Sequence, residues 1–247
     1  MNNLFGQKTV DIILDISPND IMYQCGNKEH YYGVGQSALD CINLALFAAG
    51  RDIKEIRTIL DLPSGYGRVS RFLKAFFADA DVTACDLERD AVDFCHKVFG
   101  ARPVYSSKRP ADISISGKFD LIWCGSLLTH LDFDRWDEFL IFFDSVLNDG
   151  GVLVFTTHGR YCAHLMRTGC FTYGLDSHKL RMLLQDFDHD GFGFVGYENG
   201  DNYGISLTSP SYVLSLLQKV SSLKLLLYLE KGWDSHHDVI GCIKAPF

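Results

Sequence analysis

The stretch LDLPSGYGR at residues 60–68 contains the pattern that decides the fold. It overlaps the end of an apolar, β-branched run at 56–62 and leads into residues 67–80, where apolar side chains recur at helical spacing. The stretch therefore joins a predicted strand to a predicted helix. Gly65 and Gly67 lie in this loop, and because glycine has no Cβ, a ligand can approach its backbone closely. A loop at the start of a helix also gathers free backbone N–H groups, so the pattern predicts a ligand site.

Predicted strands alternate with predicted helices through the middle of the chain. The strands are expected at 56–62, 81–87, 103–105, 118–125 and 151–159, and the helices at 67–80, 88–100 and 134–147. Such alternation implies right-handed βαβ crossovers, and hence a parallel sheet with helices on both faces. A further buried helix is expected at 36–49, before the first strand.

The C-terminal part of the chain adds two strands to this sheet. A predicted helix at 211–220 precedes two runs with strand character, at 223–229 and 238–244. Only eight residues separate these runs, which is too few for a helical crossover, so the two strands are predicted to be antiparallel. The predicted fold class is α/β, with a doubly wound, mostly parallel seven-stranded sheet and an antiparallel last strand.

Composition and charge narrow the function classes. The chain has 247 residues, of which 47% are hydrophobic, so it can bury a large core. Its formal net charge of −8 repels phosphate backbones, which makes nucleic acid a poor candidate partner. No stretch approaches about 18 consecutive apolar residues, and the first residues lack a signal-peptide pattern, so no membrane contact is expected. The eight cysteines form no CxxC motif and several lie in apolar runs, which is typical of a reducing, cytoplasmic setting.

Asp61 ends the first predicted strand, directly before the glycine loop. A carboxylate there disfavours a pyrophosphate through like-charge repulsion and favours a cofactor that carries positive charge. The loop lacks the Gly-Lys-Ser/Thr sequence of a P-loop, and it places Ser70 where a dinucleotide-binding fingerprint has its third glycine. The stretch therefore matches the nucleotide motifs poorly.

The loop resembles the first motif of the class I S-adenosylmethionine-dependent methyltransferases, which is an acid, one residue and then Gly-x-Gly-x-Gly. Asp61, Gly65 and Gly67 match this motif, and Pro63 stands in place of the first glycine. The resemblance implies a Rossmann-like methyltransferase fold, S-adenosylmethionine as the cofactor, and an enzyme that transfers a methyl group.

The resemblance covers residues 56 to about 160, and it extends to 223–247 by topology. It implies one methyltransferase domain over residues 1–247. Within that domain we expect an N-terminal helical lid at 1–50, a cofactor-binding core at 51–160, an inserted substrate cap at 161–222 and a terminal strand hairpin at 223–247.

The same resemblance assigns cofactor contacts to the strand ends. Asp86 closes the second strand and matches the acid that accepts hydrogen bonds from the ribose hydroxyls, a role that also exists in NAD sites. Ser106 and Ser107 stand where similar enzymes often place an Asp near the adenine. The expected cofactor-binding residues are Asp61, Pro63, Ser64, Gly65, Gly67, Asp86, Leu87, Ser107, Gly125 and Ser126. Tyr32, in the stretch YYGVGQ at 31–36, is expected to close a lid over the cofactor, unless this stretch is only a helix entry packed by aromatic residues.

Four histidines map to the carboxyl ends of the strands, where open α/β sheets bind their ligands. His130 follows the fourth strand, His158 ends the fifth, and His236 and His237 lie in the turn before the last strand. Histidine has a pKa near working pH, so it suits the removal of a proton from a hydroxyl acceptor. We expect catalysis from His158 and His237 first, with Asp238 as an orienting carboxylate, and then from His130. Each histidine has the alternative of packing or bonding to the backbone.

The segment after the fourth strand bears on the methyl acceptor. It reads Cys-Gly-Ser-Leu at 124–127, where family members that methylate planar amide or ring nitrogens often carry Asn/Asp-Pro-Pro-Tyr. The sequence therefore favours a hydroxyl on a small molecule, such as a sugar or a natural product. Trp233, Tyr197 and Tyr203 are candidates for stacking on it, and they could equally be core residues. Two alternatives stay open: an NAD-dependent oxidoreductase, and a non-catalytic methyltransferase-like binding module. The oligomeric state is not predicted.

No metal site is predicted. His158, Cys162, His164 and Cys170 have the spacing H-x3-C-x-H-x5-C, which fits no common zinc pattern. Cys162 and His164 are also expected on different faces of one helix. The acid at Asp132, after the fourth strand, is expected to cap the next helix and not to bind magnesium.

Overall fold

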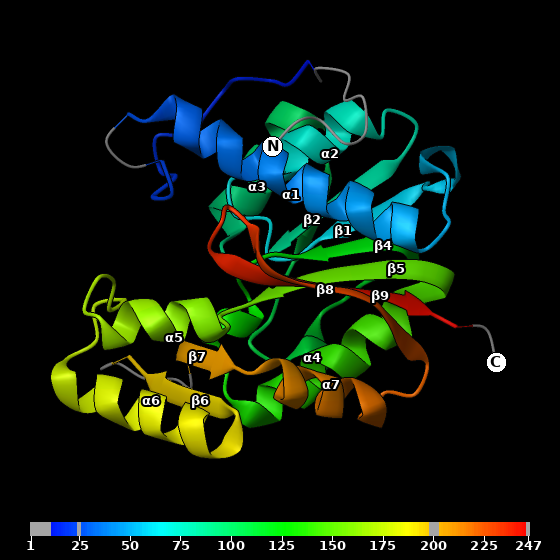
Figure 1. Ribbon diagram of the computed structural model, residues 1–247. Helices are drawn as coiled ribbons and strands as arrows, with labels where there is room; N and C mark the ends of the chain where they lie inside the picture. The colour runs from blue at the N-terminus through cyan, green and yellow to red at the C-terminus, as the bar shows by residue number, and fades with distance from the viewer. Residues whose placement is uncertain (1–10, 24–25, 198–202, 246–247) are drawn as a thin grey trace.

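A seven-stranded sheet forms the centre of the computed structural model, which describes residues 11–23, 26–197 and 203–245 (Figure 1). The strand order is β3-β2-β1-β4-β5-β9-β8. The strands are β1 (Thr58–Asp61), β2 (Asp81–Asp86), β3 (Arg102–Tyr105), β4 (Phe119–Cys124), β5 (Leu147–Thr157), β8 (Leu223–Trp233) and β9 (His237–Lys244). The first five are parallel, and β9 is antiparallel to both β5 and β8. The predicted fold class, including the antiparallel last strand, is confirmed.

Helices cover both faces of this sheet (Figure 1). The helices are α1 (Lys28–Ala48), α2 (Ser70–Phe76) and α3 (Arg89–Phe99) on one face, and α4 (Phe133–Val146) and α7 (Pro210–Lys219) on the other. Short 3₁₀ turns lie at Ile53–Glu55, Pro110–Asp112 and Leu128–His130. Two large clusters of buried apolar side chains result: one lies between the sheet and α1 with α2, and the other between the sheet and α4 with α7.

The helix boundaries follow from local chemistry. The Asp132 side chain accepts a hydrogen bond from the Arg135 N–H at the start of α4, so Asp132 caps that helix as predicted. Gly100 ends α3 in the left-handed conformation, with a φ of 66°, which a glycine adopts without steric strain.

The first helix begins earlier than the sequence predicts, at Lys28 and not near residue 36. The stretch 31–36 is therefore helical and forms no glycine lid. A Cβ at Gly35 would lie 2.4 Å from the Phe72 ring, so this glycine serves the close approach of α1 to α2. The Tyr32 hydroxyl donates to the backbone carbonyl of Leu14 at 2.7 Å, so the expected lid contact of Tyr32 is replaced by an anchor for the N-terminal segment.

The inserted cap has its own small core. It contains α5 (Arg160–Arg167), α6 (Ser177–Asp190), β6 (Phe192–Gly196) and β7 (Gly204–Thr208), and β6 pairs antiparallel with β7. The buried residues of α7, by contrast, belong to the main core beside α4, so the cap ends earlier than residue 222. Within the described ranges, no helix combines the length and the apolar character that a membrane span requires.

Candidate functional site

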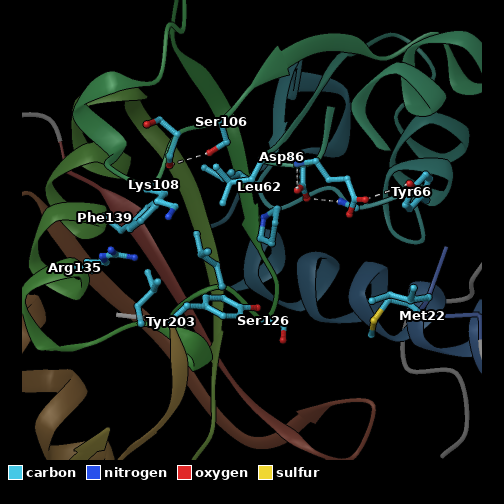
Figure 2. Close-up of a pocket in the computed structure, with 18 of the residues that line it drawn as sticks. Met22, Leu62, Tyr66, Asp86, Ser106, Lys108, Ser126, Arg135, Phe139 and Tyr203 are labelled. Carbon is cyan, nitrogen blue, oxygen red and sulfur yellow. Dashed lines mark hydrogen bonds between the residues drawn. The ribbon is translucent and has the colours of Figure 1, made fainter. Parts of the chain in front are cut away.

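A cavity of about 590 Å³ opens at the carboxyl ends of β1 to β4. The strand order reverses between β1 and β4, and open α/β sheets bind ligands at such a switch point. Residues at or just after the ends of these four strands line the cavity: 62, 63, 65 and 66 after β1, 86–88 at β2, 106–108 after β3, and 126, 127 and 131 after β4. Arg135, Phe139, Lys108 and Tyr203 lie toward one end, while Met22 and Tyr66 lie toward the other (Figure 2).

Gly65 lines the cavity and leaves space for a ligand next to its backbone. Its φ is 49°, and a Cβ built on it would meet no atom within 4 Å, although the residue lines the cavity. Gly67, with a φ of 78°, differs, because a Cβ there would lie 2.4 Å from the Phe99 ring. Gly67 therefore allows α3 to pack against the loop, whereas Gly65 leaves space for a ligand at the backbone.

Asp86 connects the end of β2 to the glycine loop. Its Oδ2 accepts a hydrogen bond from the Gly65 N–H at 2.8 Å, and its Oδ1 accepts one from the Glu88 N–H at 3.0 Å. Each carboxylate oxygen can accept a further bond, and Asp86 lines the cavity (Figure 2). The residue is therefore both the support of the loop and a free acceptor for ligand hydroxyls.

Asp61 lies behind the cavity and not on its wall. Its side chain is 1% exposed, its Oδ2 accepts from the Ser70 hydroxyl at 2.5 Å, and its Oδ1 has no hydrogen-bond partner in the described part of the chain. Burial raises the pKa of Asp61 to about 7, with the Ser70 bond opposing the shift. Asp61 therefore does not reach a ligand in the cavity, contrary to the sequence prediction. It instead links the end of β1 to the start of α2 through Ser70.

Replacing Asp61 with asparagine is expected to flatten the pH profile of stability. The pKa of this carboxyl is 3.8 ordinarily and about 7 in the folded chain, so its favourable contribution is complete below pH 3.8 and is lost as the pH rises to about 7. As the pH rises through this window, the free energy of unfolding of the wild type should fall relative to that of Asp61→Asn, by up to about 1.4 kcal/mol for each pH unit. Urea unfolding of both proteins across the window measures the difference, and parallel profiles would show that Asp61 does not titrate there.

Several predicted contacts do line the cavity. Of the expected cofactor-binding residues, these are Pro63, Gly65, Asp86, Leu87, Ser107 and Ser126. Ser126 has a φ of 60° and donates its N–H to the Thr156 hydroxyl at 2.8 Å. A non-glycine residue in this conformation is uncommon and occurs often at functional sites. Ser64 and Gly125, like Asp61 and Gly67, are not part of the cavity wall.

The N-terminal segment, part of the lid expected at 1–50, forms a wall of the cavity through residues that the sequence does not single out. Asp20 and Met22 line the cavity, and Asp20 accepts a hydrogen bond from the Tyr31 hydroxyl at 2.5 Å. Arg71, 1% exposed, donates to the Tyr31 hydroxyl and to the backbone carbonyls of Ile13 and Asp15. This buried guanidinium holds the segment over α2, and nothing in the local sequence of 11–23 indicates it.

Two further walls come from α4 and the cap. Arg135 and Phe139 are four residues apart, so they share one face of α4, and both line the cavity. Tyr197 and Tyr203 enter from the ends of β6 and β7, and the Tyr197 N–H bonds to the Tyr203 carbonyl at 3.0 Å. The i, i+4 spacing on α4 is a sequence signal that could have identified the first pair.

The four histidines lie together, as their predicted positions require. The ring centroids of His158 and His237 are 4.8 Å apart, and His158 lies 6.0 Å from His236 and 6.3 Å from His130. None of the four lines the cavity directly. His130 is nearest to it, because its ring stacks on that of Tyr203 at 4.9 Å and the next residue, Leu131, is part of the wall.

Burial keeps the histidine rings neutral. It lowers the pKa of His130, lowers that of His158 well below its usual value, and lowers that of His237 to about 3. The Nδ1 of His130 lies 2.7 Å from the Gly204 carbonyl, so Nδ1 must be protonated and Nε2 carries the lone pair. The Nδ1 of His237 lies 3.2 Å from the Thr156 hydroxyl, behind Ser126.

Comparisons with known proteins agree with this geometry. Residues 60–153 match the family model described as a methyltransferase domain. No curated protein matches the sequence. Among solved structures, the chain is similar to an S-adenosylmethionine-dependent methyltransferase from Clostridium acetobutylicum, with 15% identity over 85% of this chain and 92% of that chain and a TM-score of 0.59.

Two other solved structures have the same fold. One is magnesium protoporphyrin IX methyltransferase from Synechocystis PCC 6803 with bound SAH, with 13% identity over 88% of this chain and 87% of that chain and a TM-score of 0.56. The other is an O-methyltransferase family protein from Burkholderia thailandensis, with 14% identity over 91% of this chain and 62% of that chain and a TM-score of 0.52. At these identities the likeness concerns the fold.

Proposed function

We propose that the chain is a methyltransferase that uses S-adenosylmethionine as its cofactor, and that it methylates a hydroxyl group of a small molecule, such as a sugar or a natural product; the match of residues 60–153 to a methyltransferase domain and the class I fold support this. The observation that supports this acceptor is the neutral His130, placed behind the Tyr203 wall with its Nε2 unprotonated. A similar fold in an O-methyltransferase family protein agrees with it.

The residues of the cavity fit S-adenosylmethionine. Asp86 offers free acceptor capacity for two ribose hydroxyls, and Leu87, 57% exposed, offers an apolar surface for the adenine beside Ser107. Gly65 leaves the space above its backbone open, which the methionine portion requires. When bound, the cofactor supplies an activated methyl group on a sulfonium.

The protein's own part in the reaction is alignment and proton removal. The cavity residues would hold the acceptor hydroxyl close to the cofactor's methyl group, which would pass from sulfur to oxygen, and orientation alone can supply a large share of the rate. The hydroxyl must also lose its proton, and we assign this proton to Nε2 of His130. Burial prevents the His130 ring from being protonated at neutral pH, so the accepting nitrogen is available.

His158 and His237 are not the base in this proposal, although the sequence makes them the first candidates for that role. His158 is 2% exposed and His237 lies behind Thr156 and Ser126, so both rings lie further from the cavity than His130, which stacks on the cavity-lining Tyr203. Asp238, the expected orienting carboxylate, accepts instead from the Tyr228 hydroxyl at 2.9 Å and from the Lys231 N–H at 3.0 Å. In this proposal the two histidines therefore support the structure behind the site and do not remove the acceptor proton.

The size and walls of the cavity favour a small acceptor. A volume of about 590 Å³ lies within the usual range for small-molecule sites and must hold the cofactor as well as the acceptor. Phe139, Tyr197 and Tyr203 provide aromatic surfaces on the cavity wall, on which a sugar or an aromatic ring can stack, and the two tyrosines contact His130. We therefore place the acceptor between these rings and the glycine loop.

Replacing Asp86 with alanine is expected to weaken cofactor binding by about tenfold to a hundredfold, because hydrogen bonds to a charged acceptor contribute about 1.5–3 kcal/mol. Calorimetric titration with S-adenosylhomocysteine measures the loss. The variant also loses the support of the Gly65 N–H, so a 2′-deoxy analogue of the cofactor is titrated in parallel. If Asp86 contacts the ribose, the analogue loses little further affinity in the variant, whereas simply additive losses would assign Asp86 to loop support alone.

An acceptor screen tests the proposed function. The protein is incubated with S-adenosylmethionine that carries a deuterated methyl group and with a panel of sugars, phenols, amines and carboxylic acids. We expect a mass increase at a hydroxyl of a sugar or phenol, and no product when the protein carries Gly65→Val. Transfer only to amines or carboxylic acids would contradict the hydroxyl assignment while leaving the cofactor assignment intact.

A further inference from the structure

We infer that His158, Cys162 and His236 form a binding site for a zinc-type divalent cation between the cap and the sheet. Each residue offers one ligand atom, and the three atoms lie within 4.8 Å of one another. His158 follows β5, Cys162 lies in the first turn of α5, and His236 lies in the turn between β8 and β9. The site is separate from the cavity that holds the cofactor.

The distances suit a tetrahedral ion after a small contraction. The Cys162 Sγ lies 3.8 Å from the Nε2 of His236. A tetrahedral zinc with bonds of about 2.3 Å to sulfur and about 2.0 Å to nitrogen separates such atoms by about 3.5 Å. The pair is thus within a few tenths of an ångström of the required spacing, and the widest spacing in the group, at most 4.8 Å, must close by up to about 1.5 Å.

An unpartnered nitrogen supports the assignment independently. His158 is 2% exposed, and its Nδ1 is buried without a hydrogen-bond partner among the described residues. A buried polar atom without a partner is unfavourable by about 1–3 kcal/mol, so such atoms are rare in folded proteins. A cation bound by the His158 imidazole would supply the partner that this ring lacks.

Tyr173 closes the remaining side of the site. Its hydroxyl lies 2.5 Å from the Nε2 of His236, and its ring centroid lies 4.7 Å from that of His158. The residue holds a φ of 55°, an uncommon conformation for tyrosine, in the segment between α5 and α6. The Nε2 of His236 has a single lone pair, so the Tyr173 hydroxyl must turn away from this nitrogen when the ion binds there. The three ligands leave a fourth tetrahedral position, which this hydroxyl is near enough to occupy.

The donor atoms select the class of cation. One thiolate and two imidazoles favour zinc over magnesium or calcium, which prefer oxygen ligands. Binding releases the Cys162 thiol proton to solvent, since the thiolate is the ligand. The ion would then fix α5 and Tyr173 of the cap to the β8–β9 turn, which lies far away in the sequence.

Metal titration tests the inference. The whole protein is freed of metal with a chelator and titrated with zinc and with cobalt(II), whose thiolate complexes absorb visibly. We expect one zinc per chain, a higher melting temperature with zinc, and a thiolate–cobalt band. Cys162→Ser and His236→Gln should each lower the affinity at least a hundredfold and abolish the band.

Two exposed residues of the same segment provide matched controls. His164 and Cys170 are exposed and lie outside the cluster, so His164→Gln and Cys170→Ser should bind zinc as the wild type does. If Cys162→Ser folds poorly, His236→Gln still tests the site, because its partly exposed turn tolerates the change.

Absence of zinc binding by the wild type, or unchanged binding by both ligand variants, would overturn the inference. Neither outcome bears on methyl transfer.

Discussion

Replacing Gly65 with valine is expected to abolish cofactor binding while the fold is retained. The Cβ position of Gly65 has no atom within 4 Å and the residue lines the cavity, so a valine side chain would extend into the volume that we assign to the methionine portion. We expect the affinity for S-adenosylhomocysteine to fall at least a hundredfold, or about 2.7 kcal/mol. Isothermal titration calorimetry measures the loss, and circular dichroism checks the fold.

Strain at a positive φ must be separated from crowding of the cofactor. A non-glycine residue in the left-handed region is destabilising by about 1–2 kcal/mol wherever it lies. Gly117 has a φ of 85°, is exposed, and also has no atom within 4 Å of its Cβ position, so Gly117→Val imposes backbone strain outside the cavity. We expect Gly117→Val to bind the cofactor normally. Normal affinity in Gly65→Val would remove the glycine loop from the cofactor site.

Replacing His130 with glutamine is expected to lower turnover by about 10²–10⁴-fold while cofactor affinity is retained, because a positioned base contributes this much. Glutamine can still donate a hydrogen bond to the Gly204 carbonyl that the His130 Nδ1 contacts, so the local structure should persist. Initial rates with the acceptor identified by the screen, together with calorimetry, separate the two effects.

The pH dependence of turnover gives a second test of His130. Burial lowers its pKa below the usual 6.5, so the wild-type rate should rise with pH through a limb below 6.5 and then stay level at neutral pH. The limb should be absent in His130→Gln. If His158→Gln or His237→Gln removes turnover and the limb while His130→Gln does not, the base belongs to the buried pair, as the sequence expectation had it.

Strand ends were the most predictable part of this molecule. Asp86 and Gly65 follow predicted parallel strands, and the carboxyl ends of such strands meet at one edge, so their presence in one cavity could be read from the sequence. Asp61 shows the limit of this reasoning. Its position at the end of β1 was correct, but the direction of its side chain, toward Ser70 on α2, depends on packing that the spacing of residues does not encode.

Long-range contacts account for most of what the sequence missed. The glycines of YYGVGQ appeared as a lid because glycine usually marks a turn, whereas Gly35 instead makes room for Phe72 across a helix pair. The residues that complete the site at 20–22 depend on Arg71, which lies about 50 residues further along the chain. The cluster of His158 and Cys162 was missed because its third member, His236, is 74 residues from Cys162.

Titration of the wild-type protein with S-adenosylhomocysteine and, separately, with NAD distinguishes a methyltransferase from an oxidoreductase. We expect one S-adenosylhomocysteine bound per chain, competition by S-adenosylmethionine for the same site, and no measurable heat with NAD. The charge arrangement supports the difference, since three carboxylates, Asp20, Asp86 and Glu88, outnumber the two cations, Lys108 and Arg135, on the cavity wall and disfavour a pyrophosphate. Binding of NAD without binding of S-adenosylhomocysteine would contradict the account and return the chain to the oxidoreductase alternative.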